Sequence, residues 1–275
     1  MPMISTNASE GRPGLQWDPL LYLKYSDLRM RPAVELLQRV ALEAPSVVYD
    51  IGCGPGHVTR ALQEKWPRAS VCGVDSSPQM LAAAATEAEG IAWEHADIRH
   101  WVPKAGADLI FASAVLHFLD DHETLLPRLL GYLRPGGYLA LHMPNWCGTP
   151  WYALMREVLA TAGPGGTVLG SPVLRSELGR NPVQSATFYY QLLADRTAYL
   201  DIWETDYLQI VEGDDAVYDW IKASGLRAVT DHLEAGECTS FLAQYVPRLR
   251  KLYPNGADGR TLFPFRRLFI VAQVG

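Results

Sequence analysis

The segment V-V-Y-D-I-G-C-G-P-G-H-V-T-R-A-L, from Val47 to Leu62, predicts a buried strand, a glycine turn and the start of a helix. Its apolar first part is typical of a strand that is covered on both faces. Glycine then recurs at Gly52, Gly54 and Gly56, and glycine allows a backbone to turn sharply and approach a ligand closely. The helix after the turn presents unpaired N–H groups at its N-terminus. We therefore expect a ligand-binding turn at the carboxyl end of this strand.

Apolar runs alternate with helical patterns on either side of this segment. Helical spacing follows Pro32, a residue favoured at helix starts. We expect further helices at 58–66, 78–88, 122–133, 214–223 and 237–252, and strands at 47–51, 70–74, 91–95, 108–112, 137–143, 201–211 and 267–274. This alternation predicts an α/β fold with a parallel sheet covered on both faces.

The alternation of predicted strands and helices stops between residues 145 and 200, which are rich in Gly, Pro and Tyr. We expect this stretch to form an inserted lobe. Residues 1–14 have no apolar core and are expected to form a disordered tail. The predicted organisation is one domain over 15–275, in which 15–31 and 145–200 make a lobe that covers the substrate.

Composition excludes several classes of protein. The four cysteines are scattered without a C-x-x-C pair, which argues against zinc and disulfides and favours a reducing, cytoplasmic location. No apolar run is long enough to span a bilayer, so no membrane partner is expected. The net charge of −6 makes nucleic acid an unfavourable partner, because phosphate binding needs a basic surface. The oligomeric state stays open, with a homodimer as one option.

Each of the first three predicted strands has an aspartate at or near its carboxyl end. Asp50 precedes the glycine turn, Asp75 ends the second strand and Asp97 follows the third. The spacing G-x-G-x-G is tighter than the G-x-G-x-x-G of dinucleotide sites and suits a ligand without a pyrophosphate. A carboxylate at Asp75 can hold the hydroxyls of a ribose, and Asp97 is placed to contact an adenine amino group. The alternatives are an NAD-dependent dehydrogenase or an ordinary turn beside incidental carboxylates.

These elements in register resemble the class I S-adenosylmethionine-dependent methyltransferases. The resemblance implies a Rossmann-like seven-stranded class I methyltransferase sheet with an inserted, mainly helical substrate lobe. It also implies S-adenosyl-L-methionine as the cofactor, S-adenosyl-L-homocysteine as its product and no metal. By the same resemblance, the cofactor-binding residues are Tyr25, Asp50, Gly52, Cys53, Gly54, Gly56, Asp75, Ser76, Met80, Asp97, Ile98 and Ala114.

Longer stretches resemble the trans-aconitate 2-methyltransferase family. They include W-D-P-L-L-Y-L-K-Y (17–25), R-M-R-P-A-V-E-L-L (29–37), D-I-W-E-T-D-Y (201–207) and R-R-L-F-I-V-A (266–272). The resemblance implies carboxyl O-methylation that forms a methyl ester of a small di- or tricarboxylic acid. His117-Phe118 and M-P-N-W depart from the family pattern where the substrate should bind. The acceptor therefore stays open among aconitate-, fumarate-, itaconate- and furandicarboxylate-like acids.

A carboxylate acceptor also follows from the chemistry of methyl transfer. A carboxylic acid has a pKa of about 4.3 and is ionised at neutral pH, so it needs no general base. The protein must instead hold the substrate's other carboxylate, which arginine does best. We expect Arg31 and Arg267 to do so because both lie in family-like stretches, although an ordinary surface role is the alternative for each. The predicted substrate-binding residues are Tyr22, Arg31, His117, Trp146, Tyr207 and Arg267.

Two other functions remain open at this level. One is O- or N-methylation of a neutral or aromatic metabolite, in which His117 would be the base. In the carboxylate hypothesis the same histidine would only orient the substrate. The other alternative is a cofactor-binding module without turnover.

Overall fold

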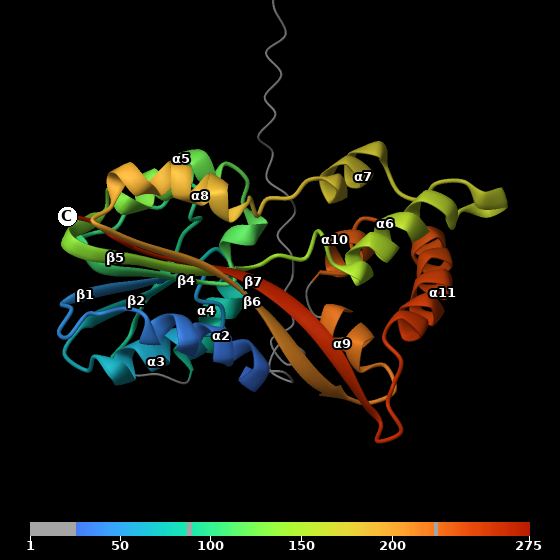
Figure 1. The fold of residues 1–275 in the computed structure, drawn as a ribbon, viewed down its shortest axis with the longest axis horizontal. Coiled ribbons are helices and arrows are strands. Elements are labelled where there is room, and N and C mark those ends of the chain that lie inside the picture. The colour runs from blue at the N-terminus through green and yellow to red at the C-terminus, as the bar shows by residue number, and fades with distance from the viewer. Residues whose placement is uncertain (1–25, 87–89, 223–224) are drawn as a thin grey trace, which may run out of the picture.

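A seven-stranded sheet forms the centre of the molecule (Figure 1). The computed structural model describes residues 26–86, 90–222 and 225–275, so the expected tail 1–14 and residues 15–25 of the expected lobe lie outside it. The strand order is β3-β2-β1-β4-β5-β7-β6, with β7 antiparallel to both of its neighbours. The strands are β1 (Val47–Ile51), β2 (Ser70–Asp75), β3 (Ala92–His95), β4 (Ala107–Ser113), β5 (Leu133–Pro144), β6 (Tyr199–Glu212) and β7 (Arg260–Gln273).

Helices cover both faces of this sheet, as the buried apolar runs predict. On β4, Leu109 and Phe111 pack into the core on one face, whereas Ile110 and Ala112 pack into the core on the other. The first face carries α2 (Ser26–Gln38), α3 (His57–Lys65) and α4 (Pro78–Ala85), and the second carries α5 (His122–Leu130) and α8 (Ala186–Leu193). The expectation of a doubly covered α/β sheet is confirmed.

Serine caps fix the starts of several helices. The Ser77 hydroxyl accepts a hydrogen bond from the Met80 N–H at 3.3 Å, and Pro78 occupies the first turn, where its missing N–H is harmless. Ser171 and Ser185 cap α7 (Pro172–Gly179) and α8 in the same way. The first described helix does not begin at Pro32 as expected, because α2 already starts at Ser26 and holds this proline inside.

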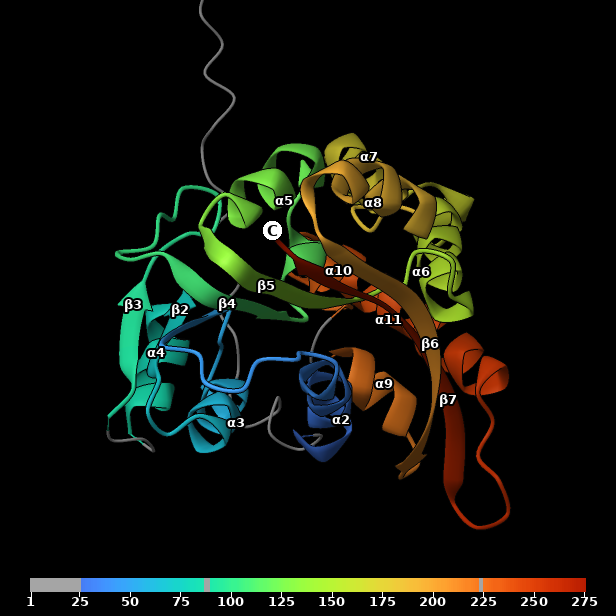
Figure 2. The ribbon, with the colours of Figure 1, turned by 60° about the vertical axis from the view of Figure 1, so that its left-hand side comes forward.

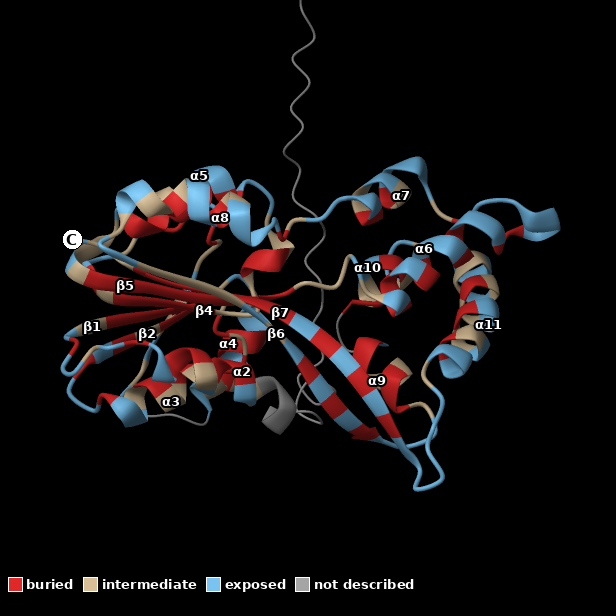
Figure 3. Cartoon of the chain, viewed as in Figure 1, coloured by how far each residue is buried: buried red, intermediate tan, exposed pale blue. Residues whose placement is uncertain are grey.

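A second, mainly helical lobe packs against one end of β6 and β7 (Figure 2). These strands extend beyond the sheet as a two-stranded ribbon, because β5 pairs with β7 only as far as Arg267. The ribbon alternates buried and exposed residues (Figure 3), and Phe263 and Phe265 enter the lobe's core. The helices of the lobe are α6 (Pro150–Thr161), η2 (Pro164–Gly166), α7, α9 (Ala216–Lys222), α10 (Arg227–Thr230) and α11 (Ala235–Leu252).

The lobe differs in extent from the one expected at 145–200. Its core includes Trp220 of α9 and Phe241 of α11, which pack with Trp151 of α6. Conversely, α8 lies on the sheet, where Tyr189 and Leu193 join the core under α5, followed by η3 (Ala194–Arg196). Helices that precede β6 in the chain and helices that lie between β6 and β7 pack together on the ribbon, so the lobe extends beyond residue 200. Within the described ranges, no helix has the length and apolarity needed to cross a membrane.

Candidate active site

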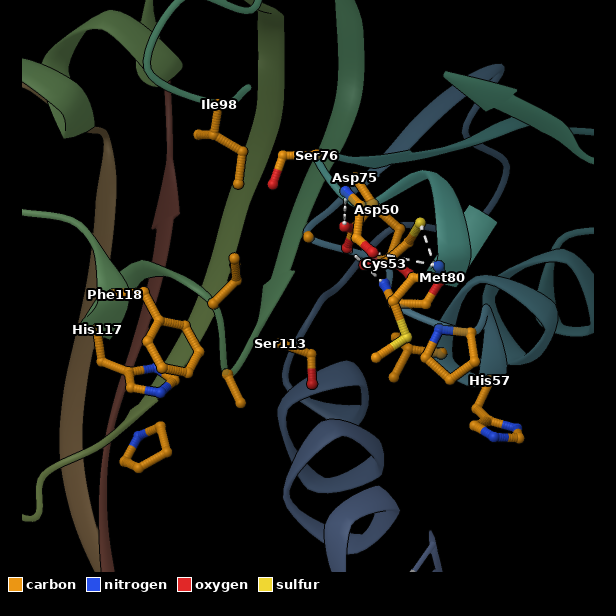
Figure 4. A pocket seen from close by; sticks show the side chains of 18 of the residues that line it. Asp50, Cys53, His57, Asp75, Ser76, Met80, Ile98, Ser113, His117 and Phe118 are labelled. Carbon is orange, nitrogen blue, oxygen red and sulfur yellow. Dashed lines mark hydrogen bonds between the residues drawn. The ribbon is translucent and has the colours of Figure 1, made fainter. Parts of the chain in front are cut away.

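A cavity of about 500 Å³ opens at the carboxyl ends of β1, β2 and β4. Ligands of open α/β sheets collect at this edge, where the strand order reverses. Asp50, Asp75 and Asp97 line one part of the cavity, and Arg267 lines another part together with aromatic side chains. Figure 4 shows Asp50, Asp75 and Met80 on one side and His117 and Phe118 on the other. The cavity therefore has an acidic end and an arginine end.

The glycine turn requires glycine for two reasons at Gly52. Its φ of 72° lies in the left-handed region, which side chains disfavour. A Cβ atom there would also lie 2.3 Å from the Val115 side chain, which follows β4. The Gly52 N–H donates to the Val74 carbonyl of β2 at 2.7 Å. The turn is thus packed tightly between the two strands beside β1.

Asp75 at the end of β2 organises this turn. Its Oδ2 accepts a hydrogen bond from the Gly54 N–H at 2.8 Å, and its Oδ1 accepts one from the Ser77 N–H at 2.8 Å. The Ser76 N–H is a third backbone donor to this carboxylate, which has about four lone-pair sites. Burial raises the pKa of Asp75, and the backbone donors oppose this shift. The carboxylate can accept a ligand hydroxyl while holding the loop.

Asp50 is fully buried at the end of β1. Its Oδ2 accepts the Thr59 hydroxyl at 2.6 Å, whereas its Oδ1 has no hydrogen-bond partner among the described residues. Burial, with a further contribution from the charge of Asp75, raises the pKa of Asp50 to about 7. A buried acceptor without a partner is costly, so a cationic ligand group near Oδ1 would be stabilised there.

Asp97 differs from the other two carboxylates because a neighbour already pairs with it. The Arg99 guanidinium lies 2.5 Å from its Oδ2, and the Arg99 N–H donates to its Oδ1 at 2.9 Å. The hydrogen bond to Arg99 lowers the pKa of Asp97. Any contact with a ligand amino group must use the remaining lone pairs, so Asp97 is a weaker candidate than Asp75.

Cys53 lies buried inside the glycine turn. Burial, reinforced by the nearby carboxylates, raises the pKa of its thiol. The thiol therefore stays protonated and is no nucleophile. We therefore interpret Cys53 as a small residue of the loop and not as a catalytic group.

The arginine end of the cavity is built around Arg267 of β7. Arg267 is charged, and yet only 3% of its surface is exposed to solvent. The guanidinium lies over the Phe265 ring at 5.1 Å, and Nη1 lies 3.3 Å from the Nδ1 of His142. Among the described residues that line the cavity, it is the one Lys or Arg. Such an arginine is a strong carboxylate ligand.

His117 lies in η1 (Leu116–Phe118), directly after β4. Its ring meets Trp146 edge to face at 4.7 Å, and its Nδ1 is buried without a hydrogen-bond partner among the described residues. Burial, followed by the charge of Arg267, holds the pKa of His117 well below its usual range. The ring is neutral at physiological pH and a poor general base. It remains able to orient a polar substrate group.

Most of the residues predicted from the sequence meet in this one cavity. The lining includes Asp50, Gly52, Cys53, Gly54, Asp75, Ser76, Met80, Asp97, Ile98, Ala114, His117, Trp146 and Arg267. Gly56 lies behind the loop, where its φ of 83° and the Trp93 ring require glycine. The expected residues Tyr22 and Tyr25 lie outside the described residues.

Arg31 and Tyr207 are not part of the lining. Both contact Glu35 of α2: Arg31 Nε lies 2.8 Å from its Oε1, and the Tyr207 hydroxyl donates to its Oε2. The Arg31 guanidinium also lies over the Tyr207 ring at 5.3 Å and is largely exposed. Glu35 thus engages both side chains, and neither lines the cavity in the structure, so their expected contact with the substrate stays a prediction.

Sequence reasoning missed further residues of the lining, among them three aromatic side chains and a serine. Phe118, Trp220 and Phe265 surround the arginine end, and Ser113 ends β4 between the two ends. Trp220 and Phe265 come from the lobe, so no local pattern could place them here. Ser113 had a signal, because the end of a strand beside the switch point is where ligands bind. No group of three or more His, Cys, Asp or Glu that could hold a metal occurs in the part of the chain that the structure describes.

Known proteins resemble this chain at two levels. A methyltransferase-domain family model matches residues 48–137. A trans-aconitate 2-methyltransferase of Pseudomonas aeruginosa (strain UCBPP-PA14) is 53% identical over 260 residues, which cover 94% of each chain. Another, from Mycobacterium tuberculosis, is 42% identical over 94% of this chain and 97% of that one.

Solved structures show the same fold at low identity. Phosphoethanolamine N-methyltransferase 2 of Haemonchus contortus, in complex with phosphomonomethylethanolamine and S-adenosylhomocysteine, matches with a TM-score of 0.52. The identity is 13%, over 89% of this chain and 53% of that one. The YcgJ protein of Bacillus subtilis matches with a TM-score of 0.56 and 15% identity, over 89% and 98% of the two chains. These likenesses bear on the fold alone.

Proposed function

Because the chain belongs to the trans-aconitate 2-methyltransferase family, we propose that it methylates one carboxylate of trans-aconitate or of a closely related small acid. The protein is an S-adenosyl-L-methionine-dependent methyltransferase. The observation that supports a carboxylic acid as the substrate is that the two ends of the cavity carry opposite charges. Carboxylates line one end and a buried arginine lines the other.

The acidic end fits S-adenosyl-L-methionine. Asp75 keeps acceptor capacity for a ribose hydroxyl besides its backbone donors, and the partnerless Oδ1 of Asp50 suits a cationic amino group. At Gly54, which lines the cavity, no described atom lies within 4 Å of the position that a Cβ would take, so a ligand can approach the backbone closely. When bound, this cofactor supplies a methyl group on positively charged sulfur, and its transfer to a carboxylate oxygen removes both charges and leaves no proton to accept.

The arginine end fits the acid. Arg267 can hold a carboxylate that does not react by two parallel N–H···O bonds, each about 1.5–3 kcal/mol in a charged pair. Phe118, Trp146, Trp220 and Phe265 exclude water from this end, which strengthens the ion pair. A small acid with two or three carboxylates can thus bind Arg267 while another carboxylate faces the acidic end.

The state of His117 favours a carboxylate over a neutral acceptor. Its pKa is held well below the usual range, so the ring is a poor acceptor for a phenol or amine proton. A carboxylate acceptor has no such proton. We therefore assign His117 an orienting role through its partnerless Nδ1.

Product analysis tests the function directly. Purified protein is incubated with S-adenosyl-L-methionine and, separately, trans-aconitate, fumarate, itaconate or an aromatic diacid, and the products are identified by mass spectrometry. A monomethyl ester from trans-aconitate is expected. No methyl ester from any of the acids would contradict the proposal and leave a cofactor-binding module without turnover.

Arg267 tests the acid end, and its neighbour gives a matched control. Arg267→Met keeps a similar volume in the buried site but removes two charge-assisted bonds, so the KM for the acid should rise by about 10²–10⁴-fold. Arg266→Ala on the same strand removes an exposed guanidinium that pairs with Asp206 at 2.7 Å and should leave KM unchanged. Affinity for S-adenosylhomocysteine, measured by calorimetry, should not change in either variant. A KM for Arg267→Met equal to that of the wild type would show that another residue holds the acid.

A further inference from the structure

His142 connects two residues of the cavity from behind. It lies on β5 and is fully buried, and it is not among the described residues that line the cavity. Its Nε2 lies 3.0 Å from the Ser113 hydroxyl oxygen, and its Nδ1 lies 3.3 Å from the Nη1 of Arg267. Ser113 and Arg267 both line the cavity. One ring therefore touches the arginine end and the middle of the cavity at once.

The contact with Arg267 decides where the proton of this ring lies. A guanidinium has donors and no acceptor, so Nδ1 must accept. The ring is neutral, because burial and the charge of Arg267 hold the pKa of His142 well below its usual range. A neutral imidazole that accepts at Nδ1 carries its hydrogen on Nε2. The Nε2–H group then donates to the Ser113 oxygen.

This arrangement gives the Ser113 hydroxyl a direction. A serine hydroxyl has one hydrogen and two lone pairs, and one lone pair accepts from His142. The hydroxyl hydrogen cannot point back at the histidine, and no acceptor for it occurs among the described residues. In Figure 4 this side chain lies between the side with Asp50 and Met80 and the side with His117. That is where the two bound reactants must meet.

We infer that Ser113 donates its hydroxyl hydrogen to one oxygen of the carboxylate that is methylated, and that His142 is the positioning residue that fixes this direction. The inference rests on the proposed function. One carboxylate oxygen is held by the hydroxyl, and the other stays free to attack. His142 anchors Arg267 through its second nitrogen, so the two groups that hold the substrate's two carboxylates have a fixed separation. This spacing selects for the length of the diacid.

The first test compares three residues at position 113 after wild-type turnover of an acid has been measured. Ser113→Ala should lower kcat/KM for the acid by about 10- to 150-fold, the effect of one hydrogen bond to a charged group, and leave the Kd for S-adenosylhomocysteine unchanged. Ser113→Thr keeps a hydroxyl and should restore most of the loss. Ser70→Ala, an exposed serine of β2, is the matched control and should have no effect.

The second test isolates the role of His142. In His142→Asn, the amide oxygen can still accept from Arg267 near the former Nδ1, but the donor toward Ser113 is lost. The Ser113→Ala change should then reduce kcat/KM much less than it does in the wild type, because an undirected hydroxyl contributes little. Melting temperatures identify variants that fail to fold. If His142→Asn fails to fold, the comparison of Ser113→Ala with Ser113→Thr still tests the inference.

Two results would overturn the inference. One is a Ser113→Ala enzyme with wild-type kcat/KM, or one that threonine does not restore. The other is an equal loss in S-adenosylhomocysteine affinity, which would place the hydroxyl on the cofactor. If wild-type protein methylates no acid, the proposed function fails first, and the two failures are distinguishable.

Discussion

Replacing Asp75 with asparagine should weaken the binding of S-adenosylhomocysteine by about 10- to 50-fold. The Gly54 and Ser77 N–H groups donate to different oxygens of this carboxylate, each at 2.8 Å. Asparagine has one acceptor oxygen and one NH2 donor. Whichever way its amide turns, one backbone N–H must face the NH2 group. One ribose hydroxyl loses its acceptor at the same position.

The lost ribose contact sets the magnitude, because the backbone hydrogen bond is absent from the variant in both the free and the bound protein. A hydrogen bond to a charged group contributes about 1.5–3 kcal/mol. Burial raises the pKa of Asp75, which means that the neutral amide recovers part of the desolvation penalty. We therefore expect the lower half of this range. The loss of the backbone hydrogen bond should also lower the free energy of unfolding of the ligand-free protein.

Calorimetric titration with S-adenosylhomocysteine measures the effect, and Asp108 supplies the control. This carboxylate also accepts two backbone N–H groups, from Ser46 at 2.7 Å and Val47 at 2.8 Å, but at the amino end of β4. Both contacts use its Oδ2, so an amide oxygen can replace it. Asp108→Asn should bind S-adenosylhomocysteine as the wild type does. Equal losses in the two variants, or no loss in Asp75→Asn, would refute the assignment of Asp75 to the ribose.

Three further predictions concern the loop and the buried titrating groups. Gly52→Ala should abolish cofactor binding and lower the melting temperature in thermal denaturation, because its Cβ would lie 2.3 Å from the Val115 side chain at a φ of 72°; unchanged binding would mean that the loop can shift. The pKa of Asp50 is about 7 without ligand, and a cationic cofactor beside it favours the ionised form. Affinity for S-adenosyl-L-methionine should then rise as the pH is raised through 7, and binding should release a proton. Calorimetry in two buffers of different ionisation enthalpy detects this proton release, and Asp50→Asn should abolish it. His117 and His142 have folded-state pKa values well below the unfolded value, so as pH falls below about 6.5 the unfolded state takes up protons first. The free energy of unfolding from denaturant titrations should then fall by up to about 1.4 kcal/mol per pH unit for each histidine, and a flat profile between pH 6.5 and 5.5 would contradict their burial as neutral rings.

The acidic end of the cavity could be predicted because its signals are local. Asp50, Gly52 and Asp75 each follow or end a short apolar strand, and parallel strands end at the same edge of a sheet. Strand and helix patterns of the first half of the chain therefore suffice to bring them together. Arg267 was found by its place in a family-like stretch, and the structure adds its burial.

Other contacts at the site are encoded by no local pattern. Arg31 is expected at the site because of its charge and its place in the chain, whereas in the structure Glu35, one helical turn away, engages it and also accepts the hydroxyl of the distant Tyr207. The link between Ser113 and His142 depends on the register of β4 against β5. Sequence spacing alone does not specify that register.

The position of Arg267 along its strand has a mechanical consequence. It is the last residue of β7 that pairs with β5, and after one more bond, from the Asn145 N–H to the Arg266 carbonyl at 3.0 Å, the strand pairs with β6 alone from Phe265 to Arg260. A ribbon of two strands twists more than a strand held at both edges. Arg267 is therefore held by paired strands on both of its edges, whereas Phe265 is held on one edge. The charge that recognises the acid is thus fixed by the sheet itself.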